Sequence, residues 1–230
     1  MWNKLAHRRR SATSSSLSDL IRLNTDTRYY QADAFVFAER RAAEVEAEHP
    51  DLPQLVIGTG GGQALMGGVA ADTLAGGAGA QSLDGAAGAD RLLGGVGRDL
   101  LLGGDGADLL RGGGGADTLA GGAGADTLAG GAGADVFRFA AVSDSPPADP
   151  DVIRDFTPGE DRIDFSEFGL GGGLAWLGGA AFTAAGHAEA RLRLQGTDRT
   201  LLLLDLDGDG EAELAILFRG AAPGAADLML

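Results

Sequence analysis

The 230-residue sequence contains no cysteine, which excludes disulfide bonds, zinc sites with thiolate ligands and cysteine nucleophiles. Its three histidines, His7, His49 and His187, are too widely separated to form the HExxHxxGxxH motif of a zinc protease. The sequence also lacks the G-x-S-x-G motif of lipases and the phosphate-binding G-x-x-x-x-G-K-[S/T] motif. These absences predict that the chain is not an enzyme.

Long apolar runs are absent as well. No run approaches the ~20 residues that a membrane-spanning helix needs, so we expect no stable membrane insertion. The basic N-terminus is followed from Ser11 to Asp19 by a stretch rich in Ser and Thr, where a cleaved signal peptide would have an apolar segment. The sequence therefore argues against a cleaved general-secretion signal.

Positive charge is scarce outside the N-terminal quarter. The formal net charge is −15, and it divides into zero for residues 1–57, −7 for residues 58–150 and −8 for residues 151–230. An acidic body of this kind repels phosphate, so we expect no binding to nucleic acid. It attracts cations instead.

Glycine is the residue present in excess, and it follows a period of nine. Residues 58–138 hold 27 of the 40 glycines, no proline and nine contiguous units of nine residues. Position 8 of every unit is apolar, and positions 1, 2 and 4 are mostly Gly. Position 6 is Gln in two units, Gln63 and Gln81, and Asp in the other seven. These aspartates are Asp72, Asp90, Asp99, Asp108, Asp117, Asp126 and Asp135.

One apolar residue in nine cannot bury itself alone, so the units must stack to share a core. Glycine permits positive φ and leaves backbone carbonyls uncovered. Ca²⁺ takes six to eight oxygen ligands from carboxylates and carbonyls, and a glycine loop that ends in Asp supplies both. The repeat therefore predicts Ca²⁺ as the bound ion. The alternative, a glycine-rich solenoid with Asp used only as a turn former, does not explain why Asp recurs at one position.

The pattern Gly-Gly-x-Gly-x-Asp-x-apolar-x resembles the calcium-binding nonapeptide of the RTX family. The resemblance implies a parallel β-roll in which two units complete one coil and unit n lies above unit n+2. One edge of the roll then carries Asp72, Asp90, Asp108 and Asp126. The other edge carries Gln63, Gln81, Asp99, Asp117 and Asp135. The predicted metal ligands are these seven aspartates together with loop glycines, namely Gly95, Gly97, Gly104, Gly106, Gly113, Gly115, Gly122 and Gly124.

The N-terminal end of the predicted roll departs from this pattern. Gln63 and Gln81 carry no charge, and both fall on one edge, so these loops are expected to bind metal weakly or not at all. The unit of Asp90 has Ala86 and Ala87 at loop positions 2 and 3, and that of Asp72 has an Ala at position 4. The sequence therefore predicts a metal-poor N-terminal end and a metal-rich middle.

The segment from Asp151 to Ser166 resembles the part of RTX proteins that closes the roll. It is predicted to form a strand, a Pro-Gly turn and a second strand. Two interpretations of Asp155, Asp161 and Asp164 remain open: they ligate a further ion, or they are solvated strand and turn residues.

Residues 176–230 are predicted to form β-hairpins, and the stretch resembles the C-terminal domain of serralysin-type secreted metalloproteases. Asp205, Asp207 and Asp209 match the first half of an EF-hand calcium loop. The twelfth position would be Ile216 and no helices flank the loop, so a true EF-hand is not expected. These aspartates are predicted metal ligands, with a tight turn that binds no metal as the alternative.

The two ends of the chain have predicted roles of their own. The terminal residues Asp227 to Leu230 resemble the uncleaved signal that type I (ABC) exporters recognise, and a final β-strand is compatible with that role. Residues Asp33 to Glu48 are predicted to form a helix that caps the open end of the roll.

Together these features predict an all-β protein. A parallel β-roll of nonapeptide repeats is followed by antiparallel β-hairpins and preceded by a short helical segment, with domains at 1–57, 58–138 and 139–230. The expected function is that of a secreted, monomeric calcium-binding protein of the type found in Gram-negative bacteria, exported by a type I system and folded by extracellular calcium. The alternative is a secretion and folding module of a serralysin-like protease or other secreted enzyme whose catalytic part is lost or separate.

Overall fold

The computed structural model describes residues 36–38, 44–45, 51–171 and 173–230, and this part of the chain is all-β apart from three short 3-10 helices. The predicted fold class is confirmed. The predicted N-terminal helix is not supported, because the described residues inside Asp33 to Glu48 form strands β1 (Val36–Ala38) and β2 (Glu44–Val45). The rest of that predicted helix lies outside the described residues.

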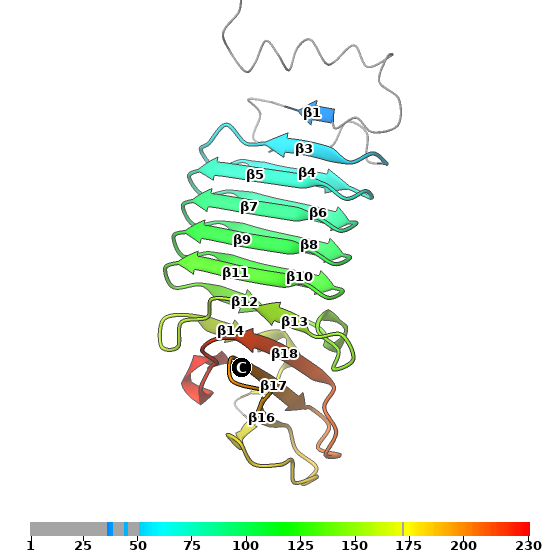
Figure 1. Ribbon diagram of the computed structural model, residues 1–230, viewed down its shortest axis with the longest axis vertical. Coiled ribbons are helices and arrows are strands. Elements are labelled where there is room, and N and C mark those ends of the chain that lie inside the picture. The colour runs from blue at the N-terminus through cyan, green and yellow to red at the C-terminus, as the bar shows by residue number, and fades with distance from the viewer. Residues whose placement is uncertain (1–35, 39–43, 46–50, 172) are drawn as a thin grey trace, which may run out of the picture.

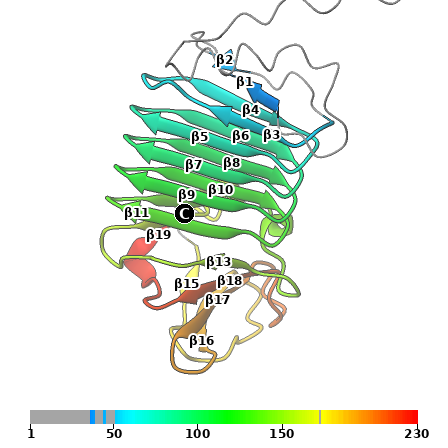
Figure 2. The same cartoon turned by 45° about the horizontal axis from the view of Figure 1, so that its top comes forward.

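The nonapeptide units form a parallel roll whose coils stack along the long axis of the molecule (Figures 1 and 2). Each unit pairs with the unit 18 residues away, as in the match of Leu74 with Leu92. Even units supply strands to one sheet and odd units to the other. The strands are β3 (Gln54–Ile57), β4 (Ala64–Gly68), β5 (Thr73–Ala78), β6 (Ser82–Ala87), β7 (Arg91–Val96), β8 (Leu100–Asp105), β9 (Leu109–Gly114), β10 (Thr118–Ala123), β11 (Thr127–Ala132) and β12 (Val136–Arg138).

The core of the roll is a double ladder built from position 8 of the repeat. Every one of these side chains is fully buried, from Leu65 to Phe137. Burial of one such side chain contributes about 1.5–3 kcal/mol, which only stacked coils can realise. At the C-terminal end the ladder passes into an aromatic cluster, where Phe156 contacts both Phe137 and Phe218 with ring centroids 6.1 and 5.4 Å apart.

The glycines at positions 2 and 4 make the turns between the two sheets. From Gly95 to Gly133 they all have positive φ, which other residues rarely adopt. A Cβ atom on Gly97 would collide with the carbonyl oxygen of Gly79 in the preceding coil. The loops therefore stack so closely that only glycine fits.

The coil continues after the repeats end. Strands β13 (Asp151–Ile153) and β14 (Arg162–Asp164) add to the two sheets in parallel, against β11 and β12. Strand β18 (Leu214–Arg219) then pairs with β13, and β17 (Arg199–Asp205), β16 (Glu189–Leu194) and β15 (Ala175–Trp176) complete an 11-stranded sheet. The last strand, β19 (Leu228–Met229), ends the 8-stranded sheet beside β14.

Candidate calcium sites along the edges of the roll

A ladder of hydrogen bonds joins the position-6 residues of successive coils. In each rung the backbone N–H of one residue donates to a side-chain oxygen of the residue one coil further on, as when Asp99 N donates to Asp117 Oδ1 at 2.8 Å. The equivalent rungs on the other edge run from Asp72 to Asp90, Asp90 to Asp108 and Asp108 to Asp126, at 2.7 Å each. The structure thus stacks the predicted ligands in the predicted order.

The second carboxylate oxygen has no such partner in most of these loops. The Oδ2 atoms that are buried and accept no hydrogen bond belong to Asp90, Asp99, Asp108, Asp117, Asp126, Asp135 and Asp151. An ionised oxygen withdrawn from water costs free energy unless it is paired or coordinates a metal. These seven oxygens are therefore the donor atoms that a cation would satisfy.

Backbone carbonyls surround the same positions. The Oδ2 atom of Asp99 lies over Gly94, the first residue of its own loop, where an added Cβ would be 2.6 Å from it. That Cβ would also be 2.6 Å from the carbonyl oxygen of Gly112 in the next coil. The loops therefore combine a carboxylate oxygen with carbonyl oxygens, and this set of hard donors fits Ca²⁺.

The electrostatics of the ladder favour a cation. Burial, reinforced by neighbouring carboxylates, raises the pKa of Asp90 and of Asp126 to about 7 and the pKa of Asp135 to about 6. The same causes raise the pKa of Asp151 to about 9. Without a counterion the ladder is thus a column of carboxylates that resist ionisation, and a divalent ion between them removes that cost.

The unit of Asp90 follows the common loop path although two glycines are replaced. Ala86 takes the position-2 conformation with φ of 73°, which costs about 1–2 kcal/mol for a residue with a side chain. Asp90 keeps its unpaired Oδ2 atom. The two alanines therefore strain this loop without removing its candidate ligand.

The ladder extends two rungs beyond the repeats, to Asp151 and Asp161. Asp151 Oδ1 accepts from Asp126 N at 2.8 Å, and Asp161 Oδ1 accepts from Asp135 N at 3.0 Å. Asp151 was not among the predicted ligands. The sequence signal for it is the Asp-x-apolar pattern of the repeat, which recurs as Asp151-Val152-Ile153.

Asp155, Asp161 and Asp164, for which the sequence left metal binding open, have different hydrogen-bond partners. Asp155 accepts from the N–H groups of Gly130 and Gly131 at 3.0 Å each, and so closes the last loop of the repeats. Asp161 joins the ladder, but its Oδ2 atom already accepts from Thr157 N at 2.8 Å. The side chain of Asp164, at the end of β14, accepts from Ser166 N at 2.9 Å and does not join the ladder.

At the N-terminal end, hydrogen bonds within the chain replace the unpaired oxygens. Gln81 Oε1 accepts from Gln63 N at 2.7 Å, and Gln81 Nε2 donates to the carbonyl oxygen of Ala78 at 3.0 Å. Asp72 uses both oxygens, accepting from Gln54 N at 2.7 Å and from Gly68 N at 2.6 Å. The loop of Asp72 also has no residue with positive φ.

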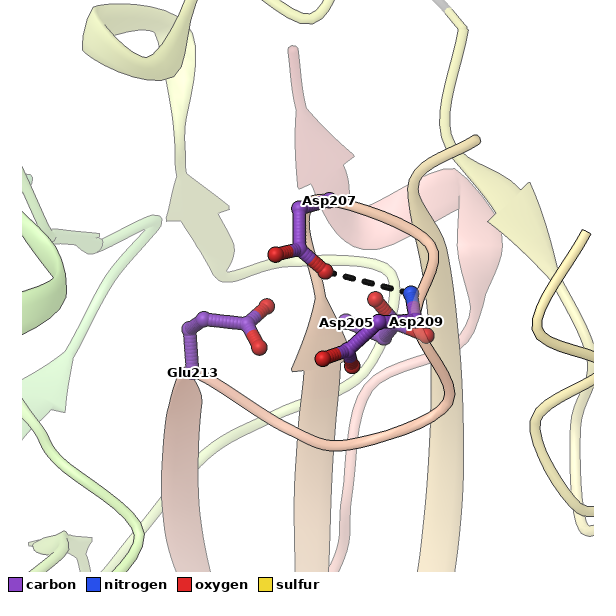
Figure 3. A group of neighbouring side chains, drawn as sticks. All are labelled: Asp205, Asp207, Asp209 and Glu213. Atoms are coloured by element: carbon purple, nitrogen blue, oxygen red, sulfur yellow. Dashed lines mark hydrogen bonds between the residues drawn. The ribbon is translucent and has the colours of Figure 1, made fainter. Parts of the chain in front are cut away.

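A separate group of carboxylates lies in the hairpin between β17 and β18 (Figure 3). Carboxylate oxygens of Asp205, Asp207, Asp209 and Glu213 lie within 4.8 Å of one another. Asp205 is buried, and its two oxygens accept from Gly208 N and Gly210 N at 2.6 and 2.7 Å. The three predicted aspartates are therefore brought together.

Glu213 was not predicted, because the EF-hand frame placed the last ligand at position 216. The hairpin pairs Leu204 with Leu214, so Glu213 stands opposite Asp205. Its Oε2 atom accepts from Leu206 N at 2.6 Å. The sequence signal for Glu213 is the hairpin itself: pairing the apolar run 201–204 with the run that starts at Leu214 places Glu213 opposite Asp205.

The stacked glycine loops, the ladder of buried carboxylates and the parallel coils define a calcium-binding β-roll of the RTX class. A family model described as RTX calcium-binding nonapeptide repeat (4 copies) matches residues 57–92. A second, described as Peptidase M10 serralysin C terminal, matches residues 76–230. The chain belongs to the serralysin C-terminal family.

Individual relatives share only parts of their length with this chain. Metallopeptidase AprA of Pseudomonas marginalis is 38% identical over 86 residues, which are 37% of this chain and 18% of that protein. The chain thus spans less than a fifth of the length of this curated relative.

Two solution structures are similar to this chain, and both are subunits of a mannuronan C5-epimerase from Azotobacter vinelandii. AlgE6R3 is 32% identical with a TM-score of 0.42, covering 69% of this chain and 77% of the subunit. AlgE6R2 is 27% identical with a TM-score of 0.39, covering 72% of this chain and 91% of the subunit. Among the described residues of the present chain, no helix combines the length and apolar character needed to cross a membrane.

Proposed function

We propose that this chain is a secreted module that folds when it binds extracellular calcium. The observation that carries the proposal is the row of seven buried Oδ2 atoms without hydrogen-bond partners. A stable protein rarely leaves buried charged oxygens unsatisfied, and calcium supplies the missing partner.

The proposed ions lie in the middle and at the C-terminal end of the roll. On one edge the ligands are Asp90, Asp108, Asp126 and Asp151, and on the other they are Asp99, Asp117 and Asp135. The carbonyls of the predicted glycines from Gly95 to Gly124 complete the coordination. A further ion binds the hairpin through Asp205, Asp207, Asp209 and Glu213.

The free energy of calcium binding is large enough to control folding. Extracellular calcium modules have Kd values of roughly 10⁻⁴–10⁻³ M, so at ~1–2 mM calcium each site with Kd ~10⁻⁴ M adds roughly 1.5–2 kcal/mol. Several such sites together match the 5–15 kcal/mol stability of a whole domain. At the sub-micromolar calcium of a cytosol they add almost nothing, and the high entropy of glycine then favours the unfolded chain.

Export through a type I system is the second part of the proposal. Leu228 and Met229 pair with Ile163 and Asp164 of β14, and Asp227 accepts from Gly159 N at 3.0 Å. The C-terminal segment therefore docks only when β14 is in place. A chain that stays unfolded at low calcium presents this segment to the exporter, and folding outside the cell then pairs it with β14.

A calcium titration tests the folding proposal. We expect a circular dichroism spectrum of an unfolded chain in EDTA, a strand-rich spectrum in millimolar calcium, and several sites by calorimetry. Magnesium is the matched control, because its smaller shell fits these loops poorly. A strand-rich spectrum in EDTA at pH 8 would contradict the proposal.

The membership in the serralysin C-terminal family favours a second candidate, a folding module that serves a protease. The family matches describe a calcium-binding repeat and the C-terminal domain of serralysins, and the sequence-based prediction that the chain itself is not an enzyme stays a prediction. A casein assay on the calcium-loaded chain tests this expectation. Casein hydrolysis that survives purification to homogeneity would overturn it.

A further inference from the structure

The scarce positive charge of the C-terminal third is concentrated on one surface. Residues 151–230 contain six arginines against fourteen acidic residues. One of the six, Arg162, forms an ion pair with Asp227 at 3.5 Å. The other five lie on the outer face of the 11-stranded sheet, and they are Arg154, Arg191, Arg193, Arg199 and Arg219.

Strand register aligns three of them in a straight row. Arg199 on β17 pairs directly with Arg219 on β18. Ile153 pairs with Phe218, so the next residues, Arg154 and Arg219, are also neighbours. Adjacent strands are ~4.8 Å apart, so the backbone positions of these three arginines, which we call the arginine row, repeat at about that interval.

The row continues along the flat face of the roll. Leu128 pairs with Ile153, which places Ala129 beside Arg154, and Ala129 pairs with Arg111. The strands that carry these residues, β9, β11, β13, β18 and β17, follow one another along the molecule in Figure 1. Four steps of ~4.8 Å give the line from Arg111 to Arg199 a length of about 19 Å.

No ion pair within the described part of the chain neutralises these arginines. The ion pairs there join Arg162 to Asp227 and His187 to Glu189. The side chains on this line are exposed, namely those of Arg111, Arg154, Arg199 and Arg219. The carboxylate of Asp155, the residue next to Arg154, already accepts hydrogen bonds from the N–H groups of Gly130 and Gly131. Like charges aligned side by side disfavour the folded state, so an external anion would be stabilising.

Apolar side chains form a parallel column two residues away on the same face. Leu109, Val152 and Leu217 are partly exposed there, Thr127 lies between Leu109 and Val152, and Leu201 at the end of the column is buried. A ligand that lies along the arginine row therefore meets guanidinium groups on one side and aliphatic carbon on the other. This arrangement suits a polymer with both an acidic group and an apolar face in each repeat.

We propose that the arginine row binds a linear anionic polysaccharide. Arginine forms paired hydrogen bonds with carboxylate or sulfate groups, and a single extended chain can follow a straight row. The whole chain carries a net charge of −15, and its acidic edges repel a membrane surface or a DNA duplex, either of which is too broad to avoid them. Single-stranded nucleic acid binds best on exposed aromatic platforms, whereas the Phe182 ring, which packs against Leu201, Leu203 and Ala215 on this face, has the Arg191 guanidinium 5.4 Å above its centroid.

The experiment measures binding of the calcium-loaded chain to immobilised hyaluronan, which carries carboxylates, and heparin, which also carries sulfates. Neutral dextran is the control polymer. We expect retention on one or both acidic polymers that weakens with salt, and no retention on dextran. The triple variant Arg154→Gln, Arg199→Gln, Arg219→Gln is expected to bind about tenfold more weakly, since each exposed pair is worth up to about 1 kcal/mol.

Matched controls separate this inference from the proposed function. The variants Arg219→Gln and Arg98→Gln each remove one exposed arginine. Arg98 lies in an edge loop away from the row. Only Arg219→Gln should therefore weaken binding to the acidic polymers. Circular dichroism spectra and calcium titrations of the variants should match those of the unaltered chain. A variant that folds with calcium but no longer binds the polymer therefore reports on the arginine row and not on the proposed calcium-dependent folding. Absence of binding to both acidic polymers, binding unchanged in the triple variant, or stronger binding to oligothymidine or to phosphatidylglycerol vesicles would each overturn the proposal.

Discussion

The Asp151 carboxylate accepts a hydrogen bond from the backbone N–H of Asp126 at 2.8 Å, across 25 residues of intervening chain. Within the repeats the same bond always spans 18 residues, as from Asp108 to Asp126. The coil therefore continues through a segment that has lost the nonapeptide sequence. Asp151 keeps the unpaired Oδ2 atom that marks the loops of the repeat.

Replacement of Asp117 by Asn should separate the two functions of the ladder carboxylate. Asn retains the oxygen that accepts from Asp99 N, but it has no charge for calcium. We expect fewer calcium sites by calorimetry and a higher calcium concentration at the folding midpoint, with no loss of strand content at saturating calcium. Asp198→Asn, which changes an exposed residue off the ladder, is the control, and an equal effect there would refute the assignment.

The metal-free chain should lose stability as the pH rises. Burial raises the pKa of Asp90, Asp126 and Asp135 in the folded state to between about 6 and about 7, above the 3.8 of an ordinary Asp. The folded state then binds more protons than the unfolded state between about pH 4 and 7, so its stability is present below pH 4 and is lost as the pH rises through these values. Because the metal-free chain is expected to be unfolded at pH 8, circular dichroism in EDTA at pH 5 and pH 8 measures this difference as strand content that is present only at the lower pH.

The calcium-loaded chain serves as the control for that pH series. Calcium stabilises the ionised carboxylates, so its contribution should grow over the same interval. A metal-free chain that is more stable at pH 8 than at pH 5 would contradict the buried ladder.

Replacement of Gln81 by Asp should create a calcium site at the N-terminal end. The loop of Gln81 already has Gly77 and Gly79 at positive φ, so its backbone matches the metal-binding loops. The variant loses the bond from Nε2 to Ala78 O and should be about 1 kcal/mol less stable without calcium. In calcium it should bind one more ion by calorimetry, and Gln81→Asn, which adds no charge, should not.

Ser145 should be essential for the junction between the roll and the C-terminal hairpins. Its buried Oγ atom accepts from Asp151 N at 2.8 Å and donates to the carbonyl oxygen of Ala215. Ser145→Ala leaves buried groups unpaired and should lower the free energy of unfolding by about 1–3 kcal/mol, measured by urea denaturation in calcium. Ser166→Ala, at an exposed position, should change it by less than about 0.5 kcal/mol.

Glu213→Gln should weaken the hairpin site alone. The variant keeps an oxygen to accept from Leu206 N, so the hairpin should fold. Calorimetry should show the loss of one site, while Glu211→Gln, an exposed neighbour, should retain it. An unchanged site count in Glu213→Gln would mean that the four carboxylates only shape the turn.

Much of the roll could be predicted from the sequence because its repeat is local. Each nine-residue unit makes half a coil, so a residue such as Asp99 must lie beside the residue 18 positions later, Asp117. Glycine at positions 2 and 4 dictates the loop, and Asp at position 6 dictates the cation. The predicted helix near the N-terminus was not supported, because Val36–Ala38 instead extends the sheet beside β3.

The sequence by itself determined the coil, its leucine core and the expected ion, since these follow from contacts that recur at one spacing. Only the tertiary structure decided which residues extend the ladder after the repeats and which arginines form one row. Those relationships join Asp126 to Asp151 and Arg154 to Arg219 through strand pairings of irregular separation. The register of such pairings is set by packing of the whole sheet, which no local pattern contains.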